Sequence, residues 1–321
     1  MSTGNNLFYS HWACKLLCSL LQRCRHPGLL YSLLKAEFFG SLFYWRWFTN
    51  TRYTFSHQLD PRPPKTVRAL VERIHVDGIA FNTFYDSASL QDNLQKISHH
   101  ISSEVDHALV ANNSPHATRT TYSTKNYNID LLPESLDLNS PLLQFALDPE
   151  ILLLSGHYLG TRPYLREVEL ILTLPSESKQ KESQLWHRDG DDLLNLKFFI
   201  YFTHVSQHTG PLQYITGSHR FGKQRGLGID MWEDRTRVSD RDMATMIPEP
   251  DWVSATGPPL TSFITDTSGY HKGGFVQRGH RVALILHYTS AMPLHPRRFQ
   301  ITGDIVSLNL SPLQSFALRP D

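Results

Sequence analysis

The chain is poor in cysteine, and the few cysteines it contains do not form the pattern of a disulfide framework. All three (Cys14, Cys18 and Cys24) lie near the N-terminus, and an odd number cannot pair completely. Disulfide bonds persist mainly in oxidising compartments. We therefore expect the protein to reside in a reducing compartment such as the cytoplasm.

Long apolar runs and an excess of charge of either sign are also missing. A membrane-spanning helix needs roughly 20 consecutive apolar residues, and Lys15, Arg23 and Lys35 interrupt the apolar stretches near the N-terminus. The 31 basic and 30 acidic residues give a net charge of +1, which provides no positive field to attract nucleic acid. We therefore expect neither a transmembrane span nor a nucleic-acid partner, and the sequence leaves the oligomeric state open.

Residues 1–59 differ from the remainder in being basic and rich in aromatic side chains, with Glu37 as their single acidic residue. The proline-rich segment 60–64 that follows is a stiff, non-helical connector. This predicts a helical N-terminal extension over residues 1–59 and a main domain over 65–321, with its core at about 77–290. We expect the extension to pack on the outside of the main domain; contact with a membrane surface or a partner protein is the alternative.

The middle of the chain contains short apolar segments separated by turn residues. Strands are expected at residues 166–174, 184–189, 196–204, 212–216, 260–265 and 281–288. Almost no helices intervene between them, which favours antiparallel pairing over a βαβ arrangement. The predicted fold is mainly β with flanking helices, built around a double-stranded β-helix (jelly-roll, cupin-like) core that can hold a small ligand between its sheets.

His187 and Asp189 lie two residues apart in one of these expected strands. Side chains two apart share a face of a strand, so the imidazole and the carboxylate should point the same way. Burying both on an inward face is costly unless they are paired or bound to a metal. They would supply two ligands of a 2-His-1-carboxylate triad for Fe(II). The best third ligand is His271, which lies beside glycines that let the backbone turn closely around an ion.

Further motifs follow His187-x-Asp189 in a characteristic order. They are Gly210-Pro211-Leu212-Gln213, then Gly217-Ser218-His219-Arg220, then the glycine-flanked His271 and Arg281 before an apolar strand. From about residue 77 to 288 the chain thus resembles the phytanoyl-CoA dioxygenase (PhyH) family of Fe(II)/2-oxoglutarate oxygenases. The resemblance implies His187, Asp189 and His271 as iron ligands, with Fe(II) as the cofactor, 2-oxoglutarate and O2 as co-substrates and ascorbate as a reductant.

The same resemblance implies that Arg281 binds the distal carboxylate of 2-oxoglutarate. A planar guanidinium suits this task because it stays charged and can meet a carboxylate with two parallel hydrogen bonds. Three other residues, Gln184, Trp186 and Asn195, are candidate pocket neighbours, for which simple packing is the alternative.

The implied activity is hydroxylation of an unidentified small organic substrate, coupled to decarboxylation of 2-oxoglutarate to succinate and CO2. Halogenating relatives replace the carboxylate ligand with a small residue, so the presence of Asp189 favours hydroxylation. Two other interpretations stay open. One is a catalytically silent barrel that serves as a binding or scaffold protein, and the other is a zinc hydrolase that uses the same three ligands with a metal-bound water.

Overall fold

The structure, a computed structural model, describes residues 63–81, 88–113, 127–175, 180, 182–192, 194–225, 237–290, 297–303 and 309–319. The predicted extension over residues 1–59 lies outside the described residues, and so do all three cysteines. The domain boundary expected at 60–64 falls at the edge of the described part and stays a prediction. Among the described residues, no helix combines the length and hydropathy that a membrane span requires.

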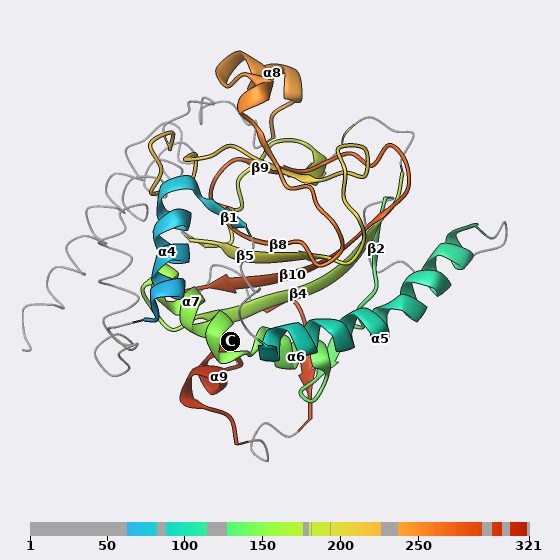
Figure 1. Cartoon of the computed structure of the whole chain (residues 1–321), viewed down its shortest axis with the longest axis vertical. Coiled ribbons are helices and arrows are strands. Elements are labelled where there is room, and N and C mark those ends of the chain that lie inside the picture. Colours follow the sequence, from blue (N-terminus) through green and yellow to red (C-terminus); the bar gives the residue numbers. More distant parts are fainter. Residues whose placement is uncertain are drawn as a thin grey trace, which may run out of the picture.

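Two antiparallel sheets form the centre of the described structure (Figure 1). The larger has the strand order β1-β8-β5-β10-β4-β2, with bounds β1 Ile79–Phe81, β2 Asn128–Asp130, β4 Tyr164–Thr173, β5 Leu196–Tyr201, β8 Ser262–Asp266 and β10 Arg281–Thr289. The smaller has the order β7-β6-β9, with bounds β6 Leu212–Tyr214, β7 Val253–Ser254 and β9 His271–Gly273. Strands β3 (Ser135–Asp137) and β11 (Gln300–Thr302) form a separate parallel pair. The predicted jelly-roll class, mainly β with flanking helices, is confirmed, and the sheets are not closed into a barrel.

The pleat of β4, β5 and β10 gives the large sheet two different faces. One face is apolar throughout, and side chains such as Leu170, Phe198 and Leu284 are buried in the main hydrophobic core. On the other face the cross-strand rows are Ile171–Ala283–Tyr201 and Glu169–Ile285–Phe199. Because neighbouring residues of a strand point to opposite faces, each of these three strands serves both the core and the space between the two sheets.

Helices cover the core face of the large sheet (Figure 1). They are α4 (Lys65–Asp77), α5 (Ala88–Asn113), α6 (Pro141–Ala146), α7 (Pro149–Leu159) and α9 (Pro312–Ala317). The side chains of Ser140 and Ser311 cap α6 and α9 by accepting hydrogen bonds from backbone N–H groups of the first turn. Helix α8 (Asp240–Met246) lies apart, on the side of the small sheet, and the short helices η2 (Glu182–Gln184) and η3 (Glu249–Asp251) complete the set among the described residues.

The segment 184–189 departs from the expected regular strand. It starts with the end of η2, and then Trp186 and His187 form isolated bridges with two different partners, Val238 and His271. A ladder cannot extend when consecutive residues pair with different segments, so the expectation of a continuous strand here was wrong. The bridges nevertheless fix the backbone next to the candidate ligands.

Candidate metal centre

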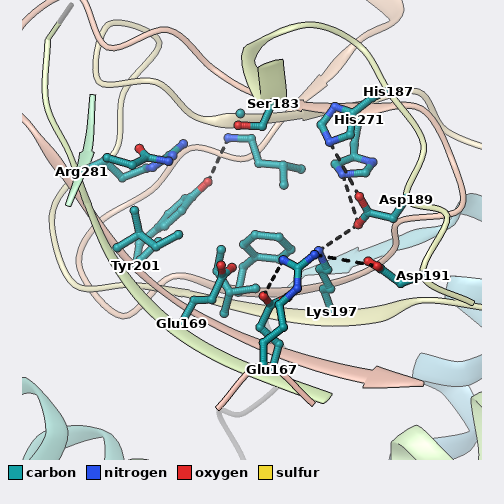
Figure 2. A pocket seen from close by; sticks show the side chains of 18 of the residues that line it. Glu167, Glu169, Ser183, His187, Asp189, Asp191, Lys197, Tyr201, His271 and Arg281 are labelled. Carbon is teal, nitrogen blue, oxygen red and sulfur yellow. Dashed lines mark hydrogen bonds and ion pairs between the residues drawn. The ribbon is translucent and has the colours of Figure 1, made fainter. Parts of the chain in front are cut away.

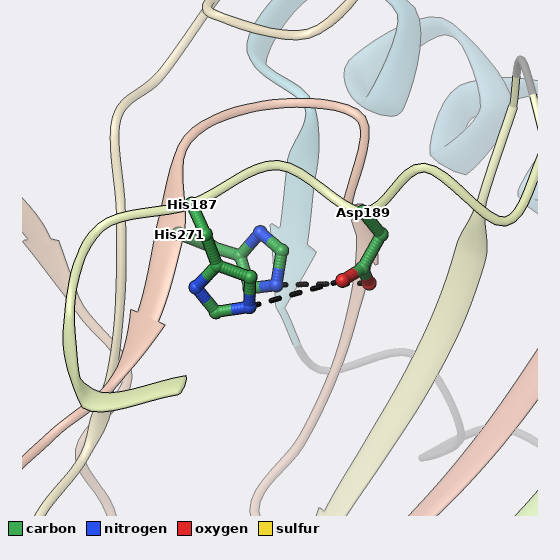
Figure 3. A group of neighbouring side chains, drawn as sticks. All are labelled: His187, Asp189 and His271. Carbon is green, nitrogen blue, oxygen red and sulfur yellow. Dashed lines mark ion pairs between the residues drawn. The ribbon is translucent and has the colours of Figure 1, made fainter. Parts of the chain in front are cut away.

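His187 and His271 lie directly opposite each other across the bridge between the loop after η2 and strand β9. Each backbone N–H donates to the carbonyl of the other residue, at 2.9 Å from His187 and 3.0 Å from His271. Residues paired in this way project their side chains to the same side. The two imidazole rings are accordingly neighbours, with centroids 4.3 Å apart (Figure 3).

Asp189 completes the group from two residues farther along the chain. Its backbone N–H donates to the carbonyl of Thr267 at 2.9 Å, and its own carbonyl accepts from Nδ2 of the buried Asn195 at 3.3 Å. Its Oδ1 lies 3.8 Å from Nε2 of His187, and its Oδ2 lies 3.7 Å from Nε2 of His271. One potential ligand atom from each of the three residues lies within 4.8 Å of the other two. The structure thus brings together the three side chains that the sequence selected.

The hydrogen bonds of the two imidazoles determine which nitrogen is free. Nδ1 of His187 lies 2.8 Å from the carbonyl oxygen of Leu185, and Nδ1 of His271 lies 3.0 Å from that of Gly269. A carbonyl oxygen can only accept, so each Nδ1 must carry the hydrogen. Both Nε2 atoms therefore turn a lone pair towards the carboxylate, in the orientation that metal-binding histidines adopt when backbone carbonyls hold them.

The charge state of the group agrees with this orientation. Burial, together with the neighbouring imidazole of His271, lowers the pKa of His187 to about 3. Burial also lowers the pKa of His271. For Asp189, burial would raise the pKa, but Lys197 and the two histidines hold it well below its ordinary value. Near neutral pH the group therefore consists of two uncharged imidazole acceptors and one carboxylate, with no proton between the imidazole Nε2 atoms and the carboxylate. A cation fits such a set of acceptors, and two imidazoles with one carboxylate are the donor set of a facial-triad iron site.

The three side chains open into a cavity of about 270 Å³ between the two sheets (Figure 2). Side chains of β4, β5 and β10 form one wall, and Leu212 and Gly273 lie on the opposite one. The apolar lining residues lie between charged groups, and Arg281 lines the same cavity as the triad. The cavity can hold a small polar ligand next to the group of acceptors.

Arg281 is the first residue of β10 and presents a guanidinium with spare donors. Nη1 donates to the carbonyl of Gly210, and Nη2 donates to Oγ1 of Thr173 at 3.1 Å. Its Nε is buried without a hydrogen-bond partner, and within the described part of the chain no carboxylate forms an ion pair with it. Burial lowers its pKa, yet an arginine remains charged. Arg281 can therefore receive an anion from the cavity.

Gly273 provides room beside this guanidinium. A Cβ at Gly273 would lie 3.9 Å from Nη2 of Arg281, and Gly273 follows His271 by two residues on β9. Two residues of a strand span about 6.6 Å, and their side chains share a face. A small diacid could thus lie along β9 between His271 and Arg281.

The opposite end of the cavity carries charges that the sequence analysis missed. Nζ of Lys197 lies 2.9 Å from Oδ2 of Asp189, and Glu167 and Asp191 lie nearby and also line the cavity. Arg298 pairs with Glu167 at 2.8 Å. The sequence does contain a signal for these residues, namely charged side chains at alternate positions of otherwise apolar strands.

The three candidate pocket neighbours, Gln184, Trp186 and Asn195, are buried and are not among the residues that line the cavity. Trp186 packs edge-to-face against Trp252, with ring centroids 4.9 Å apart. Asn195 acts on the site through its hydrogen bonds, because Nδ2 donates to the carbonyls of Asp189 and Asp192.

The chain is similar to one known protein family along more than half its length. Residues 74–259 match the family model described as Phytanoyl-CoA dioxygenase (PhyH). The matched segment includes His187 and Asp189 and ends before His271 and Arg281. None of the curated proteins is significantly similar to the chain in sequence.

Several solved structures resemble the fold at low sequence identity. EctD from S. alaskensis with bound Fe is 18% identical, covers 77% of this chain and 84% of its own, and has a TM-score of 0.47. AviO1 from Streptomyces viridochromogenes Tue57 is 15% identical, and the match covers 73% of this chain and 100% of AviO1, with a TM-score of 0.48. The epimerase SnoN, in complex with Fe3+, alpha ketoglutarate and nogalamycin RO, is 16% identical. The match covers 74% of this chain and 88% of SnoN, with a TM-score of 0.45.

Proposed function

The chain belongs to the phytanoyl-CoA dioxygenase (PhyH) family and is a non-haem iron, 2-oxoglutarate-dependent oxygenase; on this premise we propose that it hydroxylates a small organic substrate. His187, Asp189 and His271 would hold Fe(II), and Arg281 would bind the distal carboxylate of 2-oxoglutarate. Fe(II) together with 2-oxoglutarate and dioxygen supplies the oxidising chemistry, in which 2-oxoglutarate is converted to succinate and CO2.

The observation that carries the proposal is the convergence of three acceptors with no proton between them. Nε2 of each imidazole faces the carboxylate of Asp189 at 3.7–3.8 Å, while both Nδ1 atoms are engaged by backbone carbonyls. Lys197 pairs with one oxygen of this carboxylate, but among the described residues no cation lies between the carboxylate and the two Nε2 lone pairs, and burying three such acceptors against one another is costly. Zinc accepts the same donors, but membership of the PhyH family favours iron and an enzyme over the hydrolase and scaffold alternatives.

The assignment of Arg281 is supported by its spare donors and by its position. The unpartnered Nε and the remaining Nη hydrogens can form the two-bond pair that a guanidinium makes with a carboxylate. Gly273 itself contributes no side chain beside Nη2 of Arg281, and the spacing along β9 suits a five-carbon diacid that reaches from the ion to the guanidinium.

The residues of this chain have three tasks in the reaction. The triad orients the ion, Arg281 orients the co-substrate, and the apolar side chains of the buried Phe199 and the partly buried Ile285 limit the access of water. Hydroxylation is favoured because Asp189 occupies the carboxylate position of the triad. The charged end of the cavity, with Glu167 and Lys197, supports a prime substrate that carries polar groups.

The test is succinate formation by the purified full-length chain with Fe(II), ascorbate, 2-oxoglutarate and air. Wild type should form succinate slowly even without a prime substrate, and His187→Ala should abolish this activity together with the binding of one metal ion per chain. His99→Ala, which changes an exposed histidine of α5, is the matched control and should behave as wild type. Metal binding without any effect of 2-oxoglutarate would refute the proposal, and hydrolysis that requires only zinc would replace it.

A further inference from the structure

Lys197 is the one basic residue in the strand Leu196–Tyr201, and its side chain points into the cavity rather than the core. Its Nζ lies 2.9 Å from Oδ2 of Asp189 (Figure 2), and only 14% of its side chain is exposed. Within the described residues, Asp189 is the only carboxylate that forms an ion pair with this ammonium group. A cation therefore already contacts one oxygen of the candidate carboxylate ligand.

The register of the sheet determines this contact. Lys197 lies opposite His287, which in turn lies opposite Glu167 on β4. The Glu167 carboxylate is engaged by Arg298 at 2.8 Å and lies 3.5 Å from Nδ1 of His287. Because Arg298 and His287 already engage the Glu167 carboxylate, the ammonium group of Lys197 pairs with Asp189 instead.

The two oxygens of Asp189 consequently have different surroundings. Oδ2 forms an ion pair with Lys197, whereas Oδ1 lies 3.8 Å from Nε2 of His187 and, among the described residues, pairs with no lysine or arginine. A carboxylate with two free oxygens can bind an ion through one or both of them. Binding through both would take up a coordination position that the co-substrates of an open site require.

We propose that Lys197 is a positioning residue that holds Oδ2 of Asp189, so that this ligand offers the ion a single oxygen. The inference rests on the proposed function, because it takes His187, Asp189 and His271 as the ligands. Lys197 acts on the ion through Asp189 and keeps one further position open for 2-oxoglutarate or dioxygen.

Mn(II) is a suitable probe because it prefers six-coordinate sites and relaxes the protons of the waters that it binds. In Lys197→Met, Asp189 should bind through both oxygens and displace one of about three such waters, so the water-proton relaxation enhancement should fall by about one third. The dissociation constant for Mn(II) should stay equal or decrease, because a positive charge is lost and a donor is gained. Succinate formation should fall at least tenfold, since 2-oxoglutarate and dioxygen compete for fewer positions.

Two variants separate this role from a merely structural one. Lys197→Arg keeps a cation beside Oδ2 and should restore the wild-type relaxation. Lys272→Met removes another buried lysine, which pairs with Asp240 instead of Asp189, and should leave the relaxation at the wild-type value. If Lys197→Met does not fold, as judged by its thermal unfolding, Lys197→Gln takes its place with the same expectations.

Equal relaxation enhancement in wild type and Lys197→Met would refute the role of Lys197. A weaker affinity for Mn(II) with unchanged relaxation would refute it too, because Lys197 would then only support the fold of the site. A wild-type chain that binds no Mn(II) would instead refute the proposed function itself, so the two failures can be distinguished.

Discussion

Replacement of Arg281 by glutamine tests the co-substrate site most directly. An arginine has five N–H donors, and in the structure Gly210 and Thr173 account for two of them. A carboxylate could therefore form two charge-assisted hydrogen bonds with the remainder, each worth about 1.5–3 kcal/mol. Partial solvent access and the amide donor that glutamine retains reduce the expected loss to about 3 kcal/mol, which is roughly a 100-fold weaker binding of 2-oxoglutarate.

The assay is calorimetric titration of 2-oxoglutarate into the Mn(II)-loaded chain, with the affinity for Mn(II) measured separately. Arg281→Lys keeps the charge but loses the planar fork, so we expect an intermediate loss of about tenfold. The affinity for Mn(II) should not change in either variant, because Arg281 contacts none of the three ligands. If both variants bind 2-oxoglutarate within about twofold of wild type, the reasoning from spare donors is refuted.

Three further changes test the cavity, the core and the charge network. Gly273→Val should weaken the binding of 2-oxoglutarate while Mn(II) still binds, because its methyl groups fill the space beside Arg281; both affinities can be measured by calorimetry. Leu284→Ala, at a fully buried position of β10, should lower the free energy of unfolding by about 2–5 kcal/mol in urea titrations. For Glu167, burial would raise the pKa, but His287 and Lys197 outweigh burial and lower it. Its stabilising contribution is therefore complete above the ordinary carboxyl pKa of 4.5 and is lost gradually as the pH falls from there towards the lower pKa of the folded state, so the difference in unfolding free energy between wild type and Glu167→Gln should be constant near neutral pH and shrink below pH 4.5.

Much of the fold could be predicted because its signals are local. In helix α5 the apolar residues recur at helical spacing and are buried, namely Leu90, Leu94, Ile97 and Ile101. Ser140 and Ser311 each precede a proline, which is a sequence pattern of helix starts, and their side chains cap α6 and α9. Each of these features depends on residues within a few positions of one another, so no knowledge of tertiary contacts was needed.

The segment 184–189 shows where local signals fail. Apolar and aromatic residues favour a strand there, but strand formation needs a partner that runs alongside for several residues. The available partners, Val238 and His271, come from different parts of the chain and each provides a single bridge. The spacing of His187 and Asp189 still predicted that their side chains lie together, with Nε2 of His187 3.8 Å from Oδ1 of Asp189.

The pairing of the charges at this end of the cavity could not be predicted, although their positions in apolar strands are visible in the sequence, because the pairing depends on the register between strands. Glu167, His287 and Lys197 are far apart in sequence and become neighbours only through the pairing of β4, β10 and β5. The sequence predicts a strand at residues 196–204 from its apolar residues, and a single lysine in such a strand indicates no particular partner. Its ion pair with Asp189 emerges only from the three-dimensional arrangement.

The same register explains why the site and the core cannot vary independently. Phe198 and Ile200 are fully buried in the core, while Lys197 and Phe199 face the cavity from the same strand. A shift of β5 by one residue would exchange the two faces. It would bury the ammonium group of Lys197 among apolar side chains without a counter-ion, at a cost of several kcal/mol, and would expose Phe198. The apolar residues that stabilise the large sheet therefore also fix the position from which Lys197 reaches Asp189.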